Sequence, residues 1–316
     1  MKWIIGIDLG GTSTKLGLFD QNGTLVEKWQ LPTERSDHGK RILPNLAYSS
    51  KQALERHKII REEVIGIGLG VPGAVRGQSY VAPCINLDQW GGFDAAEAFS
   101  HLCGGLPVRL VNDANAAALG EIWQGSAKDV KNMLFVTLGT GVGSGVVING
   151  RVVEGAHGVG GEIGHIKLQE QENRTCGCGK HGCLEQYASA TGLVCAAHRK
   201  LESSDEPSLL RQKSVFSAKE VFDAAKAGDS LAEKLILRFA DELGRALASV
   251  SCVIDPEVIV LGGGVSMAGQ PLLEAVKRSF RRYAFPAAEE TCFRLALLDN
   301  DAGIYGAAKL MLDLAR

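Results

Sequence analysis

Long apolar runs are missing from this sequence: none reaches the ~18 residues that a membrane-spanning helix needs. The opening stretch WIIGIDLG is too short for the core of a signal peptide, and Asp8 interrupts it. An excess of charge is also missing, because the net charge of the 316 residues is only −2. Charge therefore gives no reason to expect nucleic acid or an anionic membrane as a partner. We expect a cytoplasmic protein that starts near Met1 and, from its length, has two lobes.

Cysteine is scarce outside one cluster. Three of the eight cysteines, Cys176, Cys178 and Cys183, lie close together, and in a reducing compartment such clustering indicates a metal rather than a disulfide. Three thiolates and one imidazole make a closed tetrahedral zinc site, although three unrelated thiols are the alternative. The spacing does not choose the fourth ligand among His157, His165 and His181. The other cysteines are expected to be small buried apolar residues: Cys84, Cys103, Cys195, Cys252 and Cys292.

The sequence repeats one pattern twice: an apolar strand, a glycine turn, a second strand, an Asn-Gly hairpin turn and a third strand. The first copy consists of Trp3–Leu9, Gly10-Gly11-Thr12, Lys15–Phe19, Asn22-Gly23 and Thr24–Trp29. The second copy consists of Met133–Leu138, Gly139-Thr140-Gly141, Gly145–Ile148, Asn149-Gly150 and Arg151–Glu154. Chance similarity of two hairpins is the alternative. The repeat predicts two related lobes, each with a glycine-rich hairpin facing a shared cleft.

Strands and helices alternate elsewhere, which indicates an α/β fold. Strands are predicted at Val64–Val71, Val108–Asn112 and Glu257–Leu261. Helices are predicted at Ala114–Trp123, Ala218–Ala227, Ser230–Ile254, Gln270–Tyr283 and Ala302–Leu314, and a polar loop at Ser203–Ser214.

The two glycine turns are candidate phosphate sites, because glycine lets backbone N–H groups approach phosphate oxygens. Asp8 ends the first strand, where a carboxylate is costly unless a cation such as nucleotide-bound Mg²⁺ lies nearby. A hairpin turn with a capping Asp is the structural alternative. The second loop, Thr137–Gly145, has more glycine and hydroxyl groups than a hairpin needs. It is neither a P-loop nor a Rossmann fingerprint. Two such loops favour a polyphosphate held from both sides.

Asp113 lies where a strand ends and a helix begins. A helix N-cap is the ordinary interpretation. Beside two phosphate loops, however, Asp113 becomes a candidate general base. Glu162 and Glu185 flank the cysteine cluster and could be solvated surface charges. The stretch Gly262–Val265 could contact an adenine or ribose, or form an ordinary strand-to-helix turn.

The order of these motifs resembles the ROK family of sugar kinases, and in places the glucokinases of Gram-positive bacteria. The matching stretches are DLGGT at 8–12, VPG at 71–73, NDAN at 112–115, TLGTGVGSG at 137–145, GEIGH at 161–165, CGCGKHGCLE at 176–185 and LGGGV at 261–265.

The resemblance implies an actin/Hsp70/hexokinase-like (RNase H-like) fold of two lobes with a cleft between them, and transfer of the ATP γ-phosphoryl group to the 6-hydroxyl of glucose. It implies an N-terminal lobe of residues 1–117 plus 300–316 and a C-terminal lobe of residues 118–299. It assigns Asp113 as catalytic base, and His165 as the zinc ligand beside Cys176, Cys178 and Cys183. ATP would come with Mg²⁺, the zinc would be structural, and the protein would be a homodimer or homotetramer.

The remaining site residues implied by the resemblance fall into two groups. The sugar would contact Gly73, Asn86, Asn112, Asp113, Glu162, His165 and Glu185. The nucleotide would contact Asp8, Gly10, Gly11, Thr12, Thr14, Lys15, Gly139, Thr140, Gly141, Gly143, Gly263 and Gly264.

The sequence departs from the family pattern at three places. The lysine after the first glycine turn is delayed to Lys15, Ser144 stands where glycine is common, and the segment Asn86–Trp90 is one residue longer than usual. The last departure lies where sugars are distinguished, so N-acetylmannosamine and fructose kinases are the alternatives. A sugar-responsive repressor is disfavoured because only seven residues precede Asp8 and no helix-turn-helix is evident. A chaperone or filament subunit of the same superfamily is disfavoured because it needs no hexose site.

Overall fold

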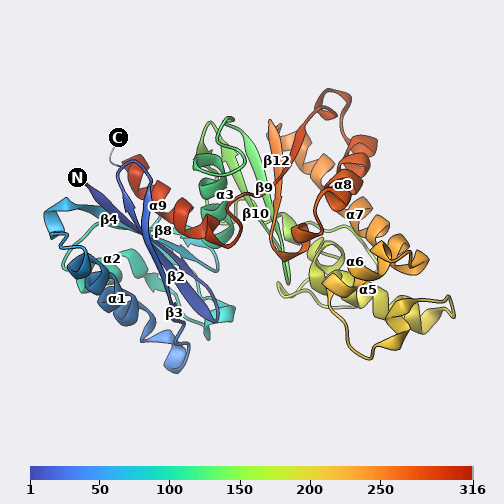
Figure 1. Ribbon diagram of the computed structural model, residues 1–316, viewed down its shortest axis with the longest axis horizontal. Helices are drawn as coiled ribbons and strands as arrows, with labels where there is room; N and C mark the ends of the chain where they lie inside the picture. The colour runs from blue at the N-terminus through green and yellow to red at the C-terminus, as the bar shows by residue number, and fades with distance from the viewer. Residues whose placement is uncertain (315–316) are drawn as a thin grey trace. The chain divides into compact units, whose positions relative to one another are not determined.

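The structure is a computed structural model that describes residues 1–314 (Figure 1), and the chain forms two compact units. The first unit contains Met1–Asp129, Gly145–Gly161 and the chain from Leu297 onward; the second contains Val130–Ser144 and Glu162–Ala296. The sequence-based lobe boundary at 117/118 falls inside helix α3 (Asp113–Trp123), which belongs to the first unit throughout. Among residues 1–314, no helix combines the length and apolarity that a membrane span requires.

One five-stranded sheet organises the first unit, in the order β3-β2-β1-β4-β8. Its strands are β1 (Trp3–Leu9), β2 (Ser13–Asp20), β3 (Leu25–Pro32), β4 (Val64–Val71) and β8 (Val108–Asn112). The hairpin strands β1, β2 and β3 pair antiparallel, whereas β4 and β8 continue the sheet in parallel. The predicted bounds of the fourth and fifth strands are confirmed.

The second five-stranded sheet has the order β11-β10-β9-β12-β13. Its strands are β9 (Met133–Leu138), β10 (Val142–Ile148), β11 (Arg151–Val152), β12 (Val258–Gly262) and β13 (Cys292–Leu295). Ranked along the chain, both sheets read third, second, first, fourth, fifth, and in both the fourth and fifth strands are parallel. The repeat predicted from the sequence is therefore confirmed in the strand order.

Helices and a small sheet complete the two units. The first unit holds α1 (Ile42–Arg56), α2 (Ala95–Leu102), α3, α9 (Ala302–Leu314), and the small sheet β5 (Val75–Arg76), β6 (Tyr80–Val81) and β7 (Phe93–Asp94). The second unit holds α4 (Glu185–Ala188), α5 (Ala190–Ser203), α6 (Ala218–Lys226), α7 (Ser230–Ile254) and α8 (Gln270–Tyr283).

Helix α9 packs directly on the first sheet because glycine occupies the contact positions. A Cβ added at Gly6 of β1 would lie 2.1 Å from the carbonyl oxygen of Ile304, and one at Gly68 of β4 would lie 1.8 Å from that of Ala307. Both distances are too short for any side chain, so the helix backbone rests on the strands themselves. This contact fixes β1 and β4, whose ends carry Asp8 and the segment leading to Gly73.

Helices α1, α2, α4 and α5 were not predicted from the sequence. The expectation that all five isolated cysteines are buried is wrong for two of them. Cys84 is buried and Cys103 and Cys195 are half-buried, but Cys252 and Cys292 are exposed. Cys252 lies near the end of α7 and Cys292 begins β13, which is an edge strand with a solvent side. The expected loop at Ser203–Ser214 contains a short 3₁₀ turn, Leu209–Gln212.

Candidate functional site

The first glycine turn is fixed by hydrogen bonds from Thr33, a residue that was not predicted from the sequence. Thr33 follows β3, and its hydroxyl donates to the carbonyl oxygen of Gly10 at 2.7 Å. Its N–H donates to the carbonyl of Thr12 at 3.0 Å. The same hydroxyl lies 2.9 Å from Oγ1 of Thr14, so buried Thr14 is turned toward Thr33. Thr33 thus fixes the turn from Gly10 to Thr12, and no local motif around residue 33 could have revealed this.

Asp8 and Lys15 face each other across the β1–β2 hairpin. Burial raises the pKa of Asp8, and the positive charge of Lys15 offsets this only partly. The Lys15 ammonium donates to the carbonyl of Asn300 at 2.6 Å. A carboxylate in this environment is incompletely compensated, which suits a site for a hydrated cation.

Among the predicted sugar-side residues of the first unit, Asn112 contacts Gly73, whereas Asn86 adjoins Gly11 of the first glycine turn. The Asn112 amide donates to the carbonyl of Gly73 at 3.1 Å, and a Cβ added at Gly11 would lie 3.6 Å from the carbonyl oxygen of Asn86. Gly73 has a φ of 130°, which favours glycine. The long segment Asn86–Trp90 accommodates its extra residue with two successive left-handed residues, and a 2.7 Å hydrogen bond from Cys84 N–H to the carbonyl of Trp90 closes the loop.

Asp113 is the first residue of α3, and the residue before it caps the helix. Oδ1 of Asn112 accepts hydrogen bonds from the N–H groups of Ala114 and Asn115 at 3.0 and 3.2 Å. Oδ1 of Asp113 also accepts from Ala114 N–H, at 2.8 Å. The capping role therefore belongs mainly to Asn112. Asp113, which directly follows β8, is exposed. Burial, and secondarily the charge of Asp113, raise the pKa of the Cys84 thiol to about 11.

The second glycine loop adjoins Glu185 and the Gly263 turn. A Cβ added at Gly141 would lie 2.5 Å from Oε2 of Glu185, and one at Gly263 would lie 2.6 Å from the carbonyl oxygen of Leu138. Gly139 and Gly264 have open space where a Cβ would point, so the backbone is accessible there. Thr140 lies in the same turn, and Gly143 is in β10. The turn after β9 thus contacts Glu185, and the turn after β12 contacts the end of β9.

The cysteine cluster converges with His165. Ligand atoms of His165, Cys176, Cys178 and Cys183 all lie within 4.8 Å of one another. The Sγ atoms of Cys176 and Cys178 are 3.4 Å apart, those of Cys178 and Cys183 are 3.7 Å apart, and Nδ1 of His165 is 3.6 Å from Sγ of Cys176. Ligands with Zn–S bonds of about 2.3 Å stand roughly 3.8 Å apart around a tetrahedral zinc ion. The four residues therefore fit zinc.

The other candidate histidine near the cluster is engaged elsewhere, because Nδ1 of His181 lies 2.9 Å from the carbonyl oxygen of Arg174. Burial raises the pKa of the Cys176 and Cys183 thiols, so thiolates here require a cation. Nε2 of His165 lies on the opposite side of the ring, 3.8 Å from Oε2 of Glu162. His165 thus faces the thiols with one nitrogen and Glu162 with the other.

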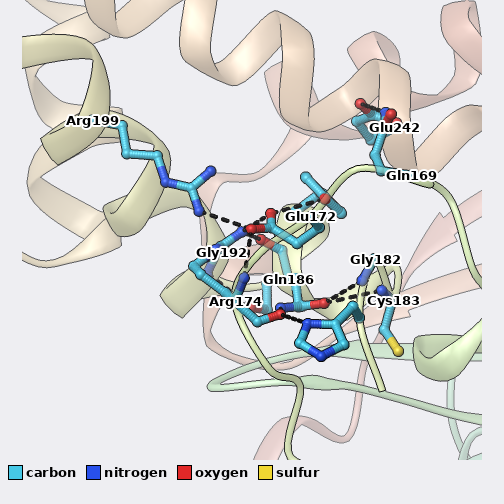
Figure 2. Close-up of polar contacts among 12 residues, drawn as sticks. Gln169, Glu172, Arg174, Gly182, Cys183, Gln186, Gly192, Arg199 and Glu242 are labelled. Atoms are coloured by element: carbon cyan, nitrogen blue, oxygen red, sulfur yellow. Dashed lines mark hydrogen bonds and ion pairs between the residues drawn. The ribbon is translucent and has the colours of Figure 1, made fainter. Parts of the chain in front are cut away.

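A hydrogen-bonded network supports this cluster (Figure 2). Oε1 of Gln186 accepts from the N–H groups of Gly182 and Cys183 at 2.8 and 3.1 Å. The buried carboxylate of Glu172 pairs with the guanidinium groups of Arg174 and Arg199 at 2.9 and 3.1 Å. The Arg174 hydrogen bonds, supported by Tyr187 and Arg199, hold the pKa of Glu172 well below its usual value despite burial. Neither Glu172 nor Gln186 was predicted from the sequence, because their local partners follow no recognised motif and the distant ones, such as Arg199, are set by the fold.

The predicted site residues thus form two groups, one in each unit. In the first unit they lie on the β1–β2 turn, after β4, in the loop around Asn86 and at the end of β8. In the second unit they lie on the turn after β9, at 162–165, in the knuckle (residues 176–183), at Glu185 and after β12. Two sheets that share one strand order, each with a glycine-rich hairpin, define the two-lobed actin- and hexokinase-like α/β class.

The chain belongs to the ROK family, whose family model matches residues 4–314. It is 41% identical over 315 residues to the glucokinase of Halalkalibacterium halodurans, covering 98% of this chain and 95% of that protein. The family resemblance seen in the motifs is therefore confirmed.

Solved structures agree in fold. The ROK hexokinase of Thermus thermophilus superimposes with a TM-score of 0.84 at 36% identity, over 99% of this chain and 98% of that one. A ROK family glucokinase from Streptomyces griseus, solved in complex with glucose and AMPPNP, has a TM-score of 0.78 at 32% identity and covers 98% of both chains.

Proposed function

We propose that this protein is an ATP-dependent glucose kinase that transfers the γ-phosphoryl group of ATP to the 6-hydroxyl of glucose. The observation that carries the proposal is likeness over 98% of the chain to a ROK glucokinase crystallised with glucose and an ATP analogue. The motifs named above, including both glycine turns and the Cys₃His cluster, are all present in this chain.

Asp113 is the proposed catalytic base. Phosphoryl transfer needs mainly positioning, electrostatic stabilisation and a group that takes the proton of the attacking hydroxyl. The oxygen of the Asn112 side chain caps α3, and its nitrogen donates to the carbonyl of Gly73. Both polar atoms of this side chain therefore fix the residue before Asp113. This leaves the Asp113 carboxylate at a fixed place after β8, where it can accept the proton of the 6-hydroxyl.

The nucleotide phosphates are assigned to the two glycine turns. Gly10, Gly11 and Thr12 offer backbone N–H groups on a turn that Thr33 fixes, and Gly139, Thr140 and Gly141 offer the equivalent turn in the second unit. Lys15 supplies positive charge beside the first turn. Mg²⁺ that arrives with ATP neutralises phosphate charge, and Asp8 is placed to bind the water molecules around it. Gly263 and Gly264 are assigned to the adenosine side.

The sugar hydroxyls are assigned to Asn86, Asn112, Asp113, Glu162, His165 and Glu185, with Gly73 beside them. Carboxylates and amides that bind each hydroxyl separate sugars sharply, because a missing partner leaves a buried polar group unpaired. Zinc, held by His165, Cys176, Cys178 and Cys183, would leave no open coordination position, so its contribution when bound is to fix the loop. His165 then presents its other nitrogen on the side of Glu162.

A coupled phosphorylation assay over a panel of hexoses tests the proposal. We expect a higher kcat/KM for glucose than for mannose, fructose or N-acetylmannosamine. N-acetylmannosamine is the most important competing sugar in the panel, because the longer Asn86–Trp90 segment is assigned to the sugar side. A better rate with N-acetylmannosamine or fructose would refute the choice of glucose, and the absence of transfer to every hexose would refute kinase activity.

We also propose a cytoplasmic location, because a reduced Cys₃His site and an ATP substrate both suit that compartment. A homodimer or homotetramer stays a prediction, and light scattering on the purified protein measures it directly.

A further inference from the structure

Glu185 occupies a junction within the second unit. Its Oε1 lies 2.8 Å from Sγ of Cys176, and its Oε2 is the atom that a side chain at Gly141 would meet. It therefore adjoins the metal ligands on one side and the second glycine loop on the other. Glu185 opens α4, a helix of only four residues. A helix this short has little stability of its own, so other contacts must fix its position.

Gln186 supplies the first of these contacts. Its side-chain oxygen accepts from the N–H groups of Gly182 and Cys183, and its side-chain nitrogen donates to the carbonyl of Arg174 at 2.9 Å. The buried side-chain amide of Gln186 thus contacts the chain on both sides of the knuckle, and Gln186 directly follows Glu185 (Figure 2). The two hydrogen bonds from Gly182 and Cys183 are buried, where an unmade bond is costly, and the one to Arg174 is partly buried.

Glu172 supplies the second contact. Nη2 of Arg174 donates both to Oε2 of Glu172 and to the carbonyl oxygen of Gln186, each at 2.9 Å. The Glu172 side chain is only 5% exposed and also accepts from Arg174 N–H, from the Tyr187 hydroxyl and from Arg199 of α5. A buried carboxylate with charged partners on two segments restricts both of them. The chain of contacts runs from Glu172 through Arg174 to Gln186, and Glu185 directly precedes Gln186 in the sequence.

We propose that Glu172 and Gln186 are positioning residues for Glu185, and that they set the affinity for the sugar without touching it. The proposal rests on the function proposed above, in which Glu185 binds a sugar hydroxyl. Because the hydrogen-bond partners of Glu172 and Gln186 named above include no residue assigned to the nucleotide, their removal should affect the sugar more than ATP.

The test is steady-state kinetics of the full-length, zinc-loaded protein and of Glu172→Gln and Gln186→Leu. We expect each variant to raise KM for glucose by about tenfold, as loss of a supporting hydrogen bond does at other sites. We expect KM for ATP to stay within about twofold of the parent, with zinc content unchanged. Gln186→Glu keeps an oxygen that accepts from Gly182 and Cys183, so it should recover most of the sugar affinity.

Glu257→Gln is the matched control. Glu257 also accepts from two backbone N–H groups, those of Lys131 and Asn132, but it holds the start of β12 instead of the knuckle. It should leave KM for glucose unchanged. If the two network variants fold poorly, Tyr187→Phe provides a milder change, because it removes one hydrogen bond to Glu172 and keeps both arginine pairs.

Three results would overturn the proposal: an unchanged KM for glucose, an equal rise in both KM values, or a loss of zinc that accounts for the whole change. The parent is assayed first on the hexose panel. If another hexose is the substrate, the variants are measured with that sugar, so a wrong choice of glucose and a wrong positioning role give different results.

Discussion

The two glycine hairpins occupy the same place in two sheets of the same order, yet they differ in charge at the end of the first strand. Asp8 is in β1 and pairs with Gly70 of the parallel strand β4, whereas Thr137 is in β9 and pairs with Gly262 of the parallel strand β12. The first hairpin therefore has a carboxylate where the second has a hydroxyl. We propose from this difference that the first hairpin lies near the cation of Mg-ATP and that the second contacts phosphate alone.

The supports of the two turns differ as well. Thr33, from the third strand of the same hairpin, fixes the first turn. Helices α4 and α5 contact the second turn: Ala190 N–H of α5 donates to the carbonyl of Gly139 at 2.8 Å, and Glu185 of α4 adjoins Gly141. The second turn thus contacts the helices that directly follow the Cys₃His cluster. The strand order repeats, but the residues that contact the turn differ between the two sheets.

The largest expected effect comes from the first unit, at Asp113. Asp113→Asn removes the base while keeping the shape, so kcat should fall by about 10²–10⁴-fold with both substrates still bound. Titration calorimetry with glucose and with AMPPNP checks binding, and the coupled assay checks the rate. A turnover within a few-fold of the parent would return Asp113 to a structural role beside Asn112.

The next effect comes from the second unit, at the knuckle. Cys178→Ala should release zinc and lower glucose affinity by about tenfold or more, with a much smaller change in ATP affinity. Atomic absorption measures the metal, and calorimetry measures each ligand. Unchanged glucose affinity in a folded, zinc-free protein would separate the knuckle from the sugar site. An equal loss of ATP binding would show that zinc holds the whole unit together.

Asp8→Asn tests the difference between the hairpins directly. The variant should lower kcat/KM for Mg-ATP by about tenfold, and Thr137→Val, the equivalent change in β9, should cost less. The raised pKa of Asp8 means that the folded state binds its proton more tightly than the unfolded state does. The contribution of Asp8 to the stability of the ligand-free parent should therefore fall as pH rises above the usual Asp value of 3.8, and level off above the raised pKa.

Urea unfolding of the ligand-free proteins at pH 4 and pH 8 measures that dependence. Asn does not titrate, so Asp8→Asn should exceed the parent in stability at pH 8 by more than at pH 4. An equal difference at the two pH values would show that Asp8 is no less stable as a carboxylate in the folded protein than in the unfolded chain.

The smallest effect is expected at Thr33. Thr33→Val removes the hydroxyl that donates to Gly10 and keeps the N–H that donates to Thr12. Loss of about 1 kcal/mol should raise KM for ATP roughly fivefold, with little change in kcat. Thr33→Ser retains the hydroxyl and should behave like the parent. Similar KM values for the Val and Ser variants would show that the turn needs no such support.

The sequence predicts the strands and long helices well where one physical signal dominates. Val64–Val71 is a β-branched run that ends at Pro72, and Ser230–Ile254 has a continuous helical apolar face. Helix α1 was not predicted because Ser49 and Ser50 lie on its buried face and interrupt the apolar period. The cysteine cluster was predicted because cysteine spacing is a local signal, whereas His165 came from the family resemblance, and zinc binding by the four residues stays a prediction. Thr33 was not predicted, because it acts on Gly10 and Thr12, which only the folded hairpin brings near. Glu172 and Gln186 were not predicted, because their local contacts follow no recognised motif and their other partners come near only in the folded chain.

The packing of α9 on Gly6 and Gly68 has a consequence for synthesis on the ribosome. The first sheet is made early, but the helix that covers it consists of residues 302–314. Until those residues leave the exit tunnel, β1 and β4 expose an apolar face shaped for a helix that is absent. The second unit lies between Val130 and Ala296, so all of its residues are available sooner. The nascent chain therefore completes its second unit before its first, and a stop codon shortly before residue 302 leaves Asp8 and Asp113 on an unfinished fold.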